Sequence, residues 1–300
     1  MKAAPRSVRW LWGALACLLT LGVPAYGHFI LTGSYDVLVP FFRHVGAAFL
    51  VLMASAETFF AHQARRVFAA TEPMHATWAM IFLGACCRLT GSALVQVLSV
   101  DLAWNPLVMF KVVDLELFRA LRDVGLVVGG PVAMAFLAVG LRRVIVLKRR
   151  LGISSGLTWW DRLFIGAIIV FTAHQIFEMG VMLRYNGKAA NLTQILLWFS
   201  DPLLALLLIQ AVSIRRSVLN LGDGLVSRCW GMMAVGVAFT SAGDAALWVE
   251  NYGLVPAVLL PIGWFLWFFA ATAYASAPCY QIEASRQAHE GSYSPLLTPG

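Results

Sequence analysis

The chain has few charged residues. Only 12% of its 300 residues are Asp, Glu, Lys or Arg, whereas soluble globular proteins carry about 25%. A chain this poor in charge cannot cover a water-facing surface, which excludes an ordinary soluble domain. The 22 basic residues outnumber the 15 acidic ones, but they border hydrophobic runs and do not cluster with aromatic residues on a soluble domain. We therefore expect no nucleic-acid partner.

The motifs of cysteine, metal and nucleotide chemistry are also missing. The five cysteines lie in or beside apolar segments and form no C-x-x-C or C-x-x-C-H pattern, so no disulfide framework or metal site is expected. The sequence has no G-x-x-x-x-G-K-[ST] phosphate loop and no H-E-x-x-H helix. An enzyme built from scattered intramembrane polar residues stays an open alternative to a non-enzymatic role.

Long hydrophobic runs are the dominant feature of the sequence. Hydrophobic residues make up 60% of the chain and its mean hydropathy is +0.77. About 20 consecutive apolar residues suffice for a helix to cross the hydrocarbon core of a bilayer. We therefore predict an all-α, polytopic transmembrane helix bundle with seven or eight membrane-spanning helices. The predicted spans are residues 10–30, 37–60, 74–100, 124–147, 158–184, 191–214, 225–250 and 254–277.

The chain divides into three predicted regions. Residues 1–27 are either a cleavable signal peptide or the first transmembrane helix, because basic residues precede an apolar run that ends near Pro24. Residues 28–278 form the bundle. Residues 279–300 are a polar tail that we expect to be cytoplasmic and disordered. Most Lys and Arg residues fall in loops on one side, which predicts a bacterial inner-membrane protein with its C-terminus in the cytoplasm.

Polar side chains inside the spans are the candidate functional residues, because an unpaired charge in hydrocarbon costs several kcal/mol. Counting about 1.5 Å per residue from the outer ends places polar groups from five helices in the outer half of the membrane. The site residues predicted for binding a ligand or ion are Arg43, His44, Arg88, Ser92, Gln96, His174, Glu178, Asp201 and Asp244. Spacings of four residues place 88, 92 and 96 on one helix face, and 174 and 178 on another.

Three further features lie within the predicted spans. The run Gly129-Gly130-Pro131 interrupts the fourth span, which is typical of a helix facing a cavity or of a kink at a helix crossing. Glu57 lies in the inner half, about 10 Å from Arg88 by residue rise, and needs a local partner or a chain of waters. Glycines 84, 91, 166, 236 and 243 are expected to allow close helix packing.

These residues predict a membrane protein that binds or translocates a small solute, ion or proton, or a sensor that acts through a partner protein. In this hypothesis the acidic residues hold a cation or proton, and Arg43 and Arg88 tune their charge. The first alternative is a b-type haem protein or the anchoring subunit of a redox complex, with His44 and His174 as the two axial ligands. A purely structural membrane subunit is the second. Expected partners are the lipid bilayer, the small solute and another membrane protein.

Overall fold

The computed structural model describes residues 4–98, 115–152, 158–185, 196, 199–219, 224–251 and 260–293. Every regular element in these ranges is a helix, which confirms the all-α prediction. The elements are α1 (Arg6–Thr32), α2 (Leu38–Pro40), the π-helical turn η1 (Phe41–Gly46), α3 (Ala47–Arg66), α4 (Pro73–Leu98), α6 (Leu115–Val127), the π-helical turn η2 (Val128–Val132), α7 (Ala133–Arg150), α8 (Trp159–Tyr185), α10 (Ser200–Leu219), α11 (Leu225–Asn251) and α12 (Leu260–Tyr293).

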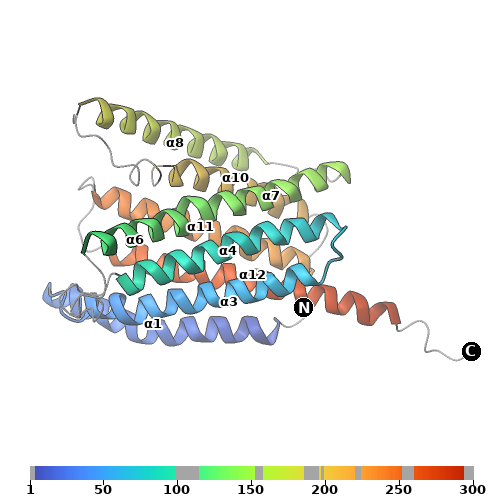
Figure 1. Ribbon diagram of the computed structural model, residues 1–300, viewed down its shortest axis with the longest axis horizontal. Helices are drawn as coiled ribbons and strands as arrows, with labels where there is room; N and C mark the ends of the chain where they lie inside the picture. The colour runs from blue at the N-terminus through green and yellow to red at the C-terminus, as the bar shows by residue number, and fades with distance from the viewer. Residues whose placement is uncertain are drawn as a thin grey trace, which may run out of the picture.

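The long helices lie side by side along one axis and form a bundle (Figure 1). Helix α12 packs against α11, α3 and α1, and α4 packs against α3 and α7. Helix α8 contacts α10 at one edge of the bundle, and α1 lies at the opposite edge (Figure 1). The centre of the bundle is therefore formed by α3, α4, α7, α11 and α12.

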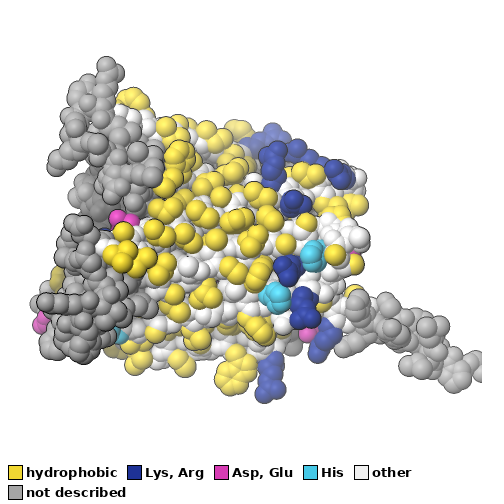
Figure 2. Space-filling view, in the orientation of Figure 1, with side chains coloured by type: hydrophobic (Ala, Val, Ile, Leu, Met, Phe, Trp, Pro, Cys, Tyr) yellow, Lys and Arg dark blue, Asp and Glu magenta, His cyan; other side chains and the backbone are white. Residues whose placement is uncertain are grey.

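Six helical stretches in the described ranges are long and apolar enough to cross a membrane, which indicates an integral membrane protein. They are Arg6–Thr32, Leu38–Arg66, Pro73–Gln96, Ala120–Arg150, Leu225–Ala246 and Pro261–Ala288. The other two predicted spans correspond to α8 and α10, so the total of seven or eight stays a prediction. Figure 2 shows a hydrophobic band along the bundle and basic side chains gathered at one end. The ends of α3 and α7 contribute Arg65, Arg66, Lys148, Arg149 and Arg150 to the basic residues.

Helix α1 is a packed part of this bundle. Its buried residues recur every three or four positions, from Val8 through Leu15 to Phe29, and form one face that packs against α12. The helix is continuous through Pro24 and ends only at Gly33, which adopts φ 68°. A boundary after residue 27 would therefore divide a single packed helix. Cleavage there stays an untested alternative to a retained first span.

The prediction of a disordered tail after Cys279 is wrong for residues 279–293, because α12 continues to Tyr293. Cys279, Tyr280 and Gln281 are still buried. The polar residues beyond them stabilise the helix through local contacts: Arg286 pairs with Glu283 at 3.0 Å, and Gln287 donates to Glu283 at 2.9 Å. The polar composition of this segment suits a solvent-exposed helix as well as a disordered tail. Residues 294–300 lie outside the described ranges.

The Gly129-Gly130-Pro131 run forms a π-helical turn within a continuous span. Pro131 has no N–H to donate, and the wider turn η2 accommodates it between α6 and α7. The same turn packs directly on α4, since a Cβ added at Gly91 would overlap the backbone of Gly129. Gly91 thus confirms the expected close packing, whereas Gly166 has no atoms near its Cβ position.

This contact predicts that Gly91→Ala destabilises the protein by about 1–3 kcal/mol, the usual cost of overpacking. The clash is with backbone, which cannot rotate away as a flexible side chain would. Gly13→Ala is the matched control, because nothing lies within 4 Å of its Cβ position. Thermal unfolding in detergent measures both variants. Equal midpoints for the two would contradict the packing of α4 on η2.

Candidate functional site

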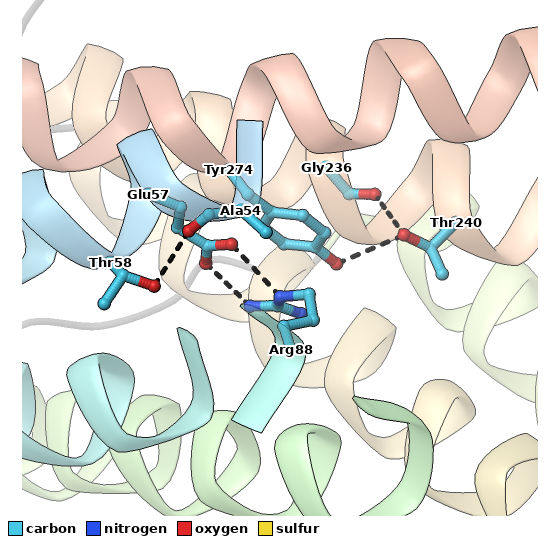
Figure 3. Close-up of polar contacts among 7 residues, drawn as sticks. All are labelled: Ala54, Glu57, Thr58, Arg88, Gly236, Thr240 and Tyr274. Atoms are coloured by element: carbon cyan, nitrogen blue, oxygen red, sulfur yellow. Dashed lines mark hydrogen bonds and ion pairs between the residues drawn. The ribbon is translucent and has the colours of Figure 1, made fainter. Parts of the chain in front are cut away.

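A buried ion pair joins α3 to α4 at the centre of the bundle (Figure 3). Arg88 Nε donates to Glu57 Oε2 at 3.1 Å, and Arg88 Nη2 donates to Glu57 Oε1 at 2.7 Å. The Glu57 side chain is 3% exposed and that of Arg88 is 19% exposed. Two parallel charge-assisted hydrogen bonds make this a strong contact. Each residue supplies the countercharge that the other requires in hydrocarbon.

The gap of about 10 Å expected between Glu57 and Arg88 from residue rise is absent, because that count ignores the direction of side chains. Successive helices α3 and α4 pack together and are joined by a short turn, so they run antiparallel. Side chains lean toward the N-terminus of their own helix. Glu57 lies nearer to the turn that joins α3 to α4, and its side chain points away from that turn. Arg88 lies farther from the turn, and its side chain points back toward it. The two side chains therefore meet.

Tyr274 on α12 forms a third side of the site. The guanidinium carbon of Arg88 lies 4.4 Å from the centre of the Tyr274 ring, a distance suited to a cation–π contact. The Tyr274 hydroxyl lies 3.4 Å from Thr240 Oγ1 on α11, and Thr240 Oγ1 donates to the carbonyl of Gly236 at 3.0 Å. Figure 3 shows the ring beside the guanidinium and its hydroxyl directed toward Thr240. Four helices therefore fix the position of Arg88.

Two glycines on α11 make room for the aromatic residues of the site. Trp267 and Tyr274 are seven residues apart on α12, and Gly236 and Gly243 are seven residues apart on the facing helix α11. A Cβ at Gly236 would lie 2.8 Å from the Tyr274 ring, and one at Gly243 would lie 2.6 Å from Trp267. The expected role of these glycines in close packing is confirmed. Larger residues there would displace both rings.

The ion pair borders a cavity of about 170 Å³ inside the bundle. Ser92, Thr240 and Tyr274 also contribute polar groups to its wall, and Gly129 of η2 lines it as well. The indole N–H of Trp267, which lines the cavity, donates to Asp244 Oδ1 at 2.9 Å. The remaining lining residues are apolar: Leu50, Ala54, Met134, Ala270 and Ala271. A mostly apolar wall with a few fixed polar groups is typical of small-molecule sites.

A second pocket of about 350 Å³ lies toward the end of the bundle opposite the basic residues. Arg43, Gln96 and Trp264 are among its lining residues. The ring centres of Trp264 and Trp267 are 5.2 Å apart in an edge-on arrangement. Trp264 lines the outer pocket and Trp267 lines the inner cavity. One face of α4 also lines both spaces: Arg88 and Ser92 line the inner cavity, and Gln96 lines the outer pocket.

The structure brings together only part of the predicted site. Arg88 and Ser92 share the inner cavity, and Asp244 reaches it through Trp267. Arg43 and Gln96 line the outer pocket. The backbones of residues 178 and 201 belong to α8 and α10, but the side chains of Glu178 and Asp201 lie outside the described part of the structure.

The two histidines suggested as haem ligands lie far apart in the fold. His44 is exposed on η1, near α1, whereas His174 is exposed on α8 at the opposite edge of the bundle (Figure 1). No group of three or more His, Cys, Asp or Glu residues in the described ranges is arranged to hold a metal ion. Haem binding stays an untested prediction, and the positions of these two side chains give it no support.

Sequence reasoning missed Thr240, Trp267 and Tyr274 as members of the site, because it considered charged residues and depth alone. A signal was present in the seven-residue spacing of Trp267 and Tyr274 around the small pair Ala270-Ala271. The matching glycines on α11 repeat that spacing. Matching spacings on two helices indicate that those helices face each other. The depth of a residue in the membrane does not give this information.

No protein-family model, curated protein or solved structure matches this chain. The fold and the site alone define its class. It is an α-helical integral membrane protein in which a buried ion pair, with no net charge, lies beside an intramembrane cavity.

The buried pair predicts that Glu57→Ala costs about 3–5 kcal/mol of stability, because it leaves Arg88 charged and unpaired. Glu283→Ala is the matched control. It removes a pair of the same kind whose arginine side chain is 64% exposed, and such pairs contribute about 1 kcal/mol or less. Unfolding by heat or denaturant in detergent measures the difference. A loss at Glu57 no larger than the loss at Glu283 would contradict the site.

Proposed function

We propose that the protein binds a small solute in the cavity beside Glu57 and Arg88. It acts as a membrane carrier or as the membrane part of a sensor that works through a partner protein. The supporting observation is the open space at the ion pair. A pair that served packing alone could be enclosed by side chains, and well-packed apolar residues often replace such pairs without loss of stability. Here the pair lines a cavity whose wall also contains the polar groups of Ser92, Thr240 and Tyr274.

The outer pocket supports a route of entry from the end opposite the basic residues. Gln96 and Ser92 follow Arg88 at four-residue steps on α4 and would offer successive hydrogen-bonding groups along the route. Trp264 lines the outer pocket and Trp267 lines the ion-pair cavity, and their rings are adjacent. In this proposal the two indoles separate the outer pocket from the ion-pair cavity, and their movement admits the solute.

The proposed route predicts that a cysteine at Ser92 reacts with a water-soluble thiol reagent. The experiment uses membranes that contain a variant whose five native cysteines are replaced by alanine. The thiolate reacts only where water reaches it, so Ser92→Cys should be modified. Leu83→Cys on the same helix is the control, because Leu83 is 39% exposed on the apolar surface and would face lipid. Labelling of Ser92→Cys no faster than that of Leu83→Cys would contradict a solute-accessible cavity.

We further propose that the basic end of the bundle faces the cytoplasm of a bacterial cell. The positive-inside rule supports this orientation. The first turns of α1 and the end of α12 lie toward that side, where α12 extends past the other helices (Figure 1).

This orientation predicts that a green fluorescent protein fused after Gly300 is fluorescent, and that alkaline phosphatase fused at the same point is inactive. Each reporter works on one side of the inner membrane only. Fusions in the turn between α1 and η1 should give the reverse pattern. An active phosphatase at the C-terminus would overturn the orientation.

A further inference from the structure

We propose that the solute is a small carboxylate anion that replaces Glu57 on Arg88 while one proton moves onto Glu57. This inference rests on the proposed function and names its substrate class. It follows from the bidentate pairing of the two residues, their burial, and the cavity that adjoins them.

The two partners of the ion pair differ in how they can lose their charge. An arginine stays protonated in proteins, whereas a buried carboxylate becomes neutral by taking up a proton. Glu57 can therefore leave the pair without leaving its own charge unpaired in the bundle. A cation that displaced Arg88 would instead leave a bare guanidinium in hydrocarbon, at a cost of several kcal/mol. The exchangeable partner is Glu57, so the incoming group is an anion.

Charge balance then requires one proton for each anion. The pair contains one negative and one positive group, and adding an anion alone would leave one uncompensated negative charge. In the exchange, a proton forms an O–H bond with a carboxylate oxygen of Glu57. The hydrogen bonds from Arg88 Nε and Nη2 pass from Glu57 to the carboxylate of the ligand. No other covalent bond changes and nothing is oxidised or reduced.

The surroundings of Glu57 suit this exchange. The charged and titratable groups near the pair in the described residues are Arg65 of α3, Cys86 and Cys87 of α4, Asp244 of α11 and Tyr274 of α12. Tyr274 is the one whose ring is stacked on the Arg88 guanidinium. That contact does not involve Glu57, so it holds the guanidinium in place when Glu57 leaves. Asp244 already accepts the Trp267 N–H at the cavity wall.

The volume of the cavity suits a small anion. Its volume of about 170 Å³ is close to that of a cavity of about 150 Å³ that binds benzene. Leu50, Met134 and Ala271 contribute apolar side chains to its lining. A carboxylate with a short hydrocarbon tail fits both features: its charged end meets Arg88 and its tail meets the apolar side chains.

Calorimetric titration of the full-length protein in detergent with sodium propanoate tests this inference. Titrations at pH 6, 7 and 8, each in buffers of different ionisation enthalpy, give both the affinity and the number of protons taken up. Aliphatic carboxylates are ionised throughout this range. We expect about one proton taken up per propanoate bound and an affinity that rises about tenfold for each unit by which the pH falls.

Variants separate the roles of the two charges. Glu57→Gln should bind propanoate without proton uptake and with an affinity independent of pH, because Arg88 is then free of its carboxylate. Glu283→Gln should behave as the wild type. Binding by the wild type without proton uptake, no binding of propanoate, or binding of ethylammonium in its place would each overturn the inference. Labelling at Ser92 tests the solute cavity separately, so a failure of the carboxylate proposal is distinguishable from a failure of the proposed function.

Discussion

Hydrocarbon cannot solvate a charge, and the pairing of Glu57 with Arg88 is how this bundle meets that constraint at its centre. The two hydrogen bonds between the side chains fix the register of α3 against α4. The Arg88 guanidinium then determines where the Tyr274 ring lies, and the ring in turn requires a glycine at position 236. One electrostatic requirement thus sets the packing of four helices.

The same requirement explains why polar chemistry and open space coincide. Aromatic rings of α12 lie against glycines of α11, and Gly129 of the π-helical turn η2 lies against α4. These close contacts adjoin a cavity that is lined by the ion pair and by apolar side chains. The face drawn in Figure 2, by contrast, carries a hydrophobic band that ends in basic side chains. The outer surface suits the bilayer, and the selective chemistry is confined to the interior.

The sequence predicts the helices well and their contacts poorly, for a physical reason. Span length follows from runs of apolar residues, so the stretches confirmed as candidate spans lie close to those expected. Contacts depend on the rotation and lean of each helix, which runs of apolar residues do not specify. The sequence therefore predicts no definite partner for Glu57 and places Arg88 with the outer residues. Arg88 and Ser92 do line the same cavity. Residues four positions apart lie on the same face of a helix, whatever their depth in the membrane. The helical extension past Cys279 was missed because polar composition alone does not distinguish a solvated helix from a disordered tail.

A double-mutant cycle on Glu57→Gln and Arg88→Gln tests the central claim most directly, because it measures the interaction between the two side chains. The free energy of unfolding is compared for the wild type, both single variants and the double variant. If the pair anchors the bundle, the double variant is more stable than the sum of the single losses predicts, with a coupling of about 2–3 kcal/mol. Additive losses, within about 0.5 kcal/mol, would show that the two charges do not depend on each other and would contradict the site.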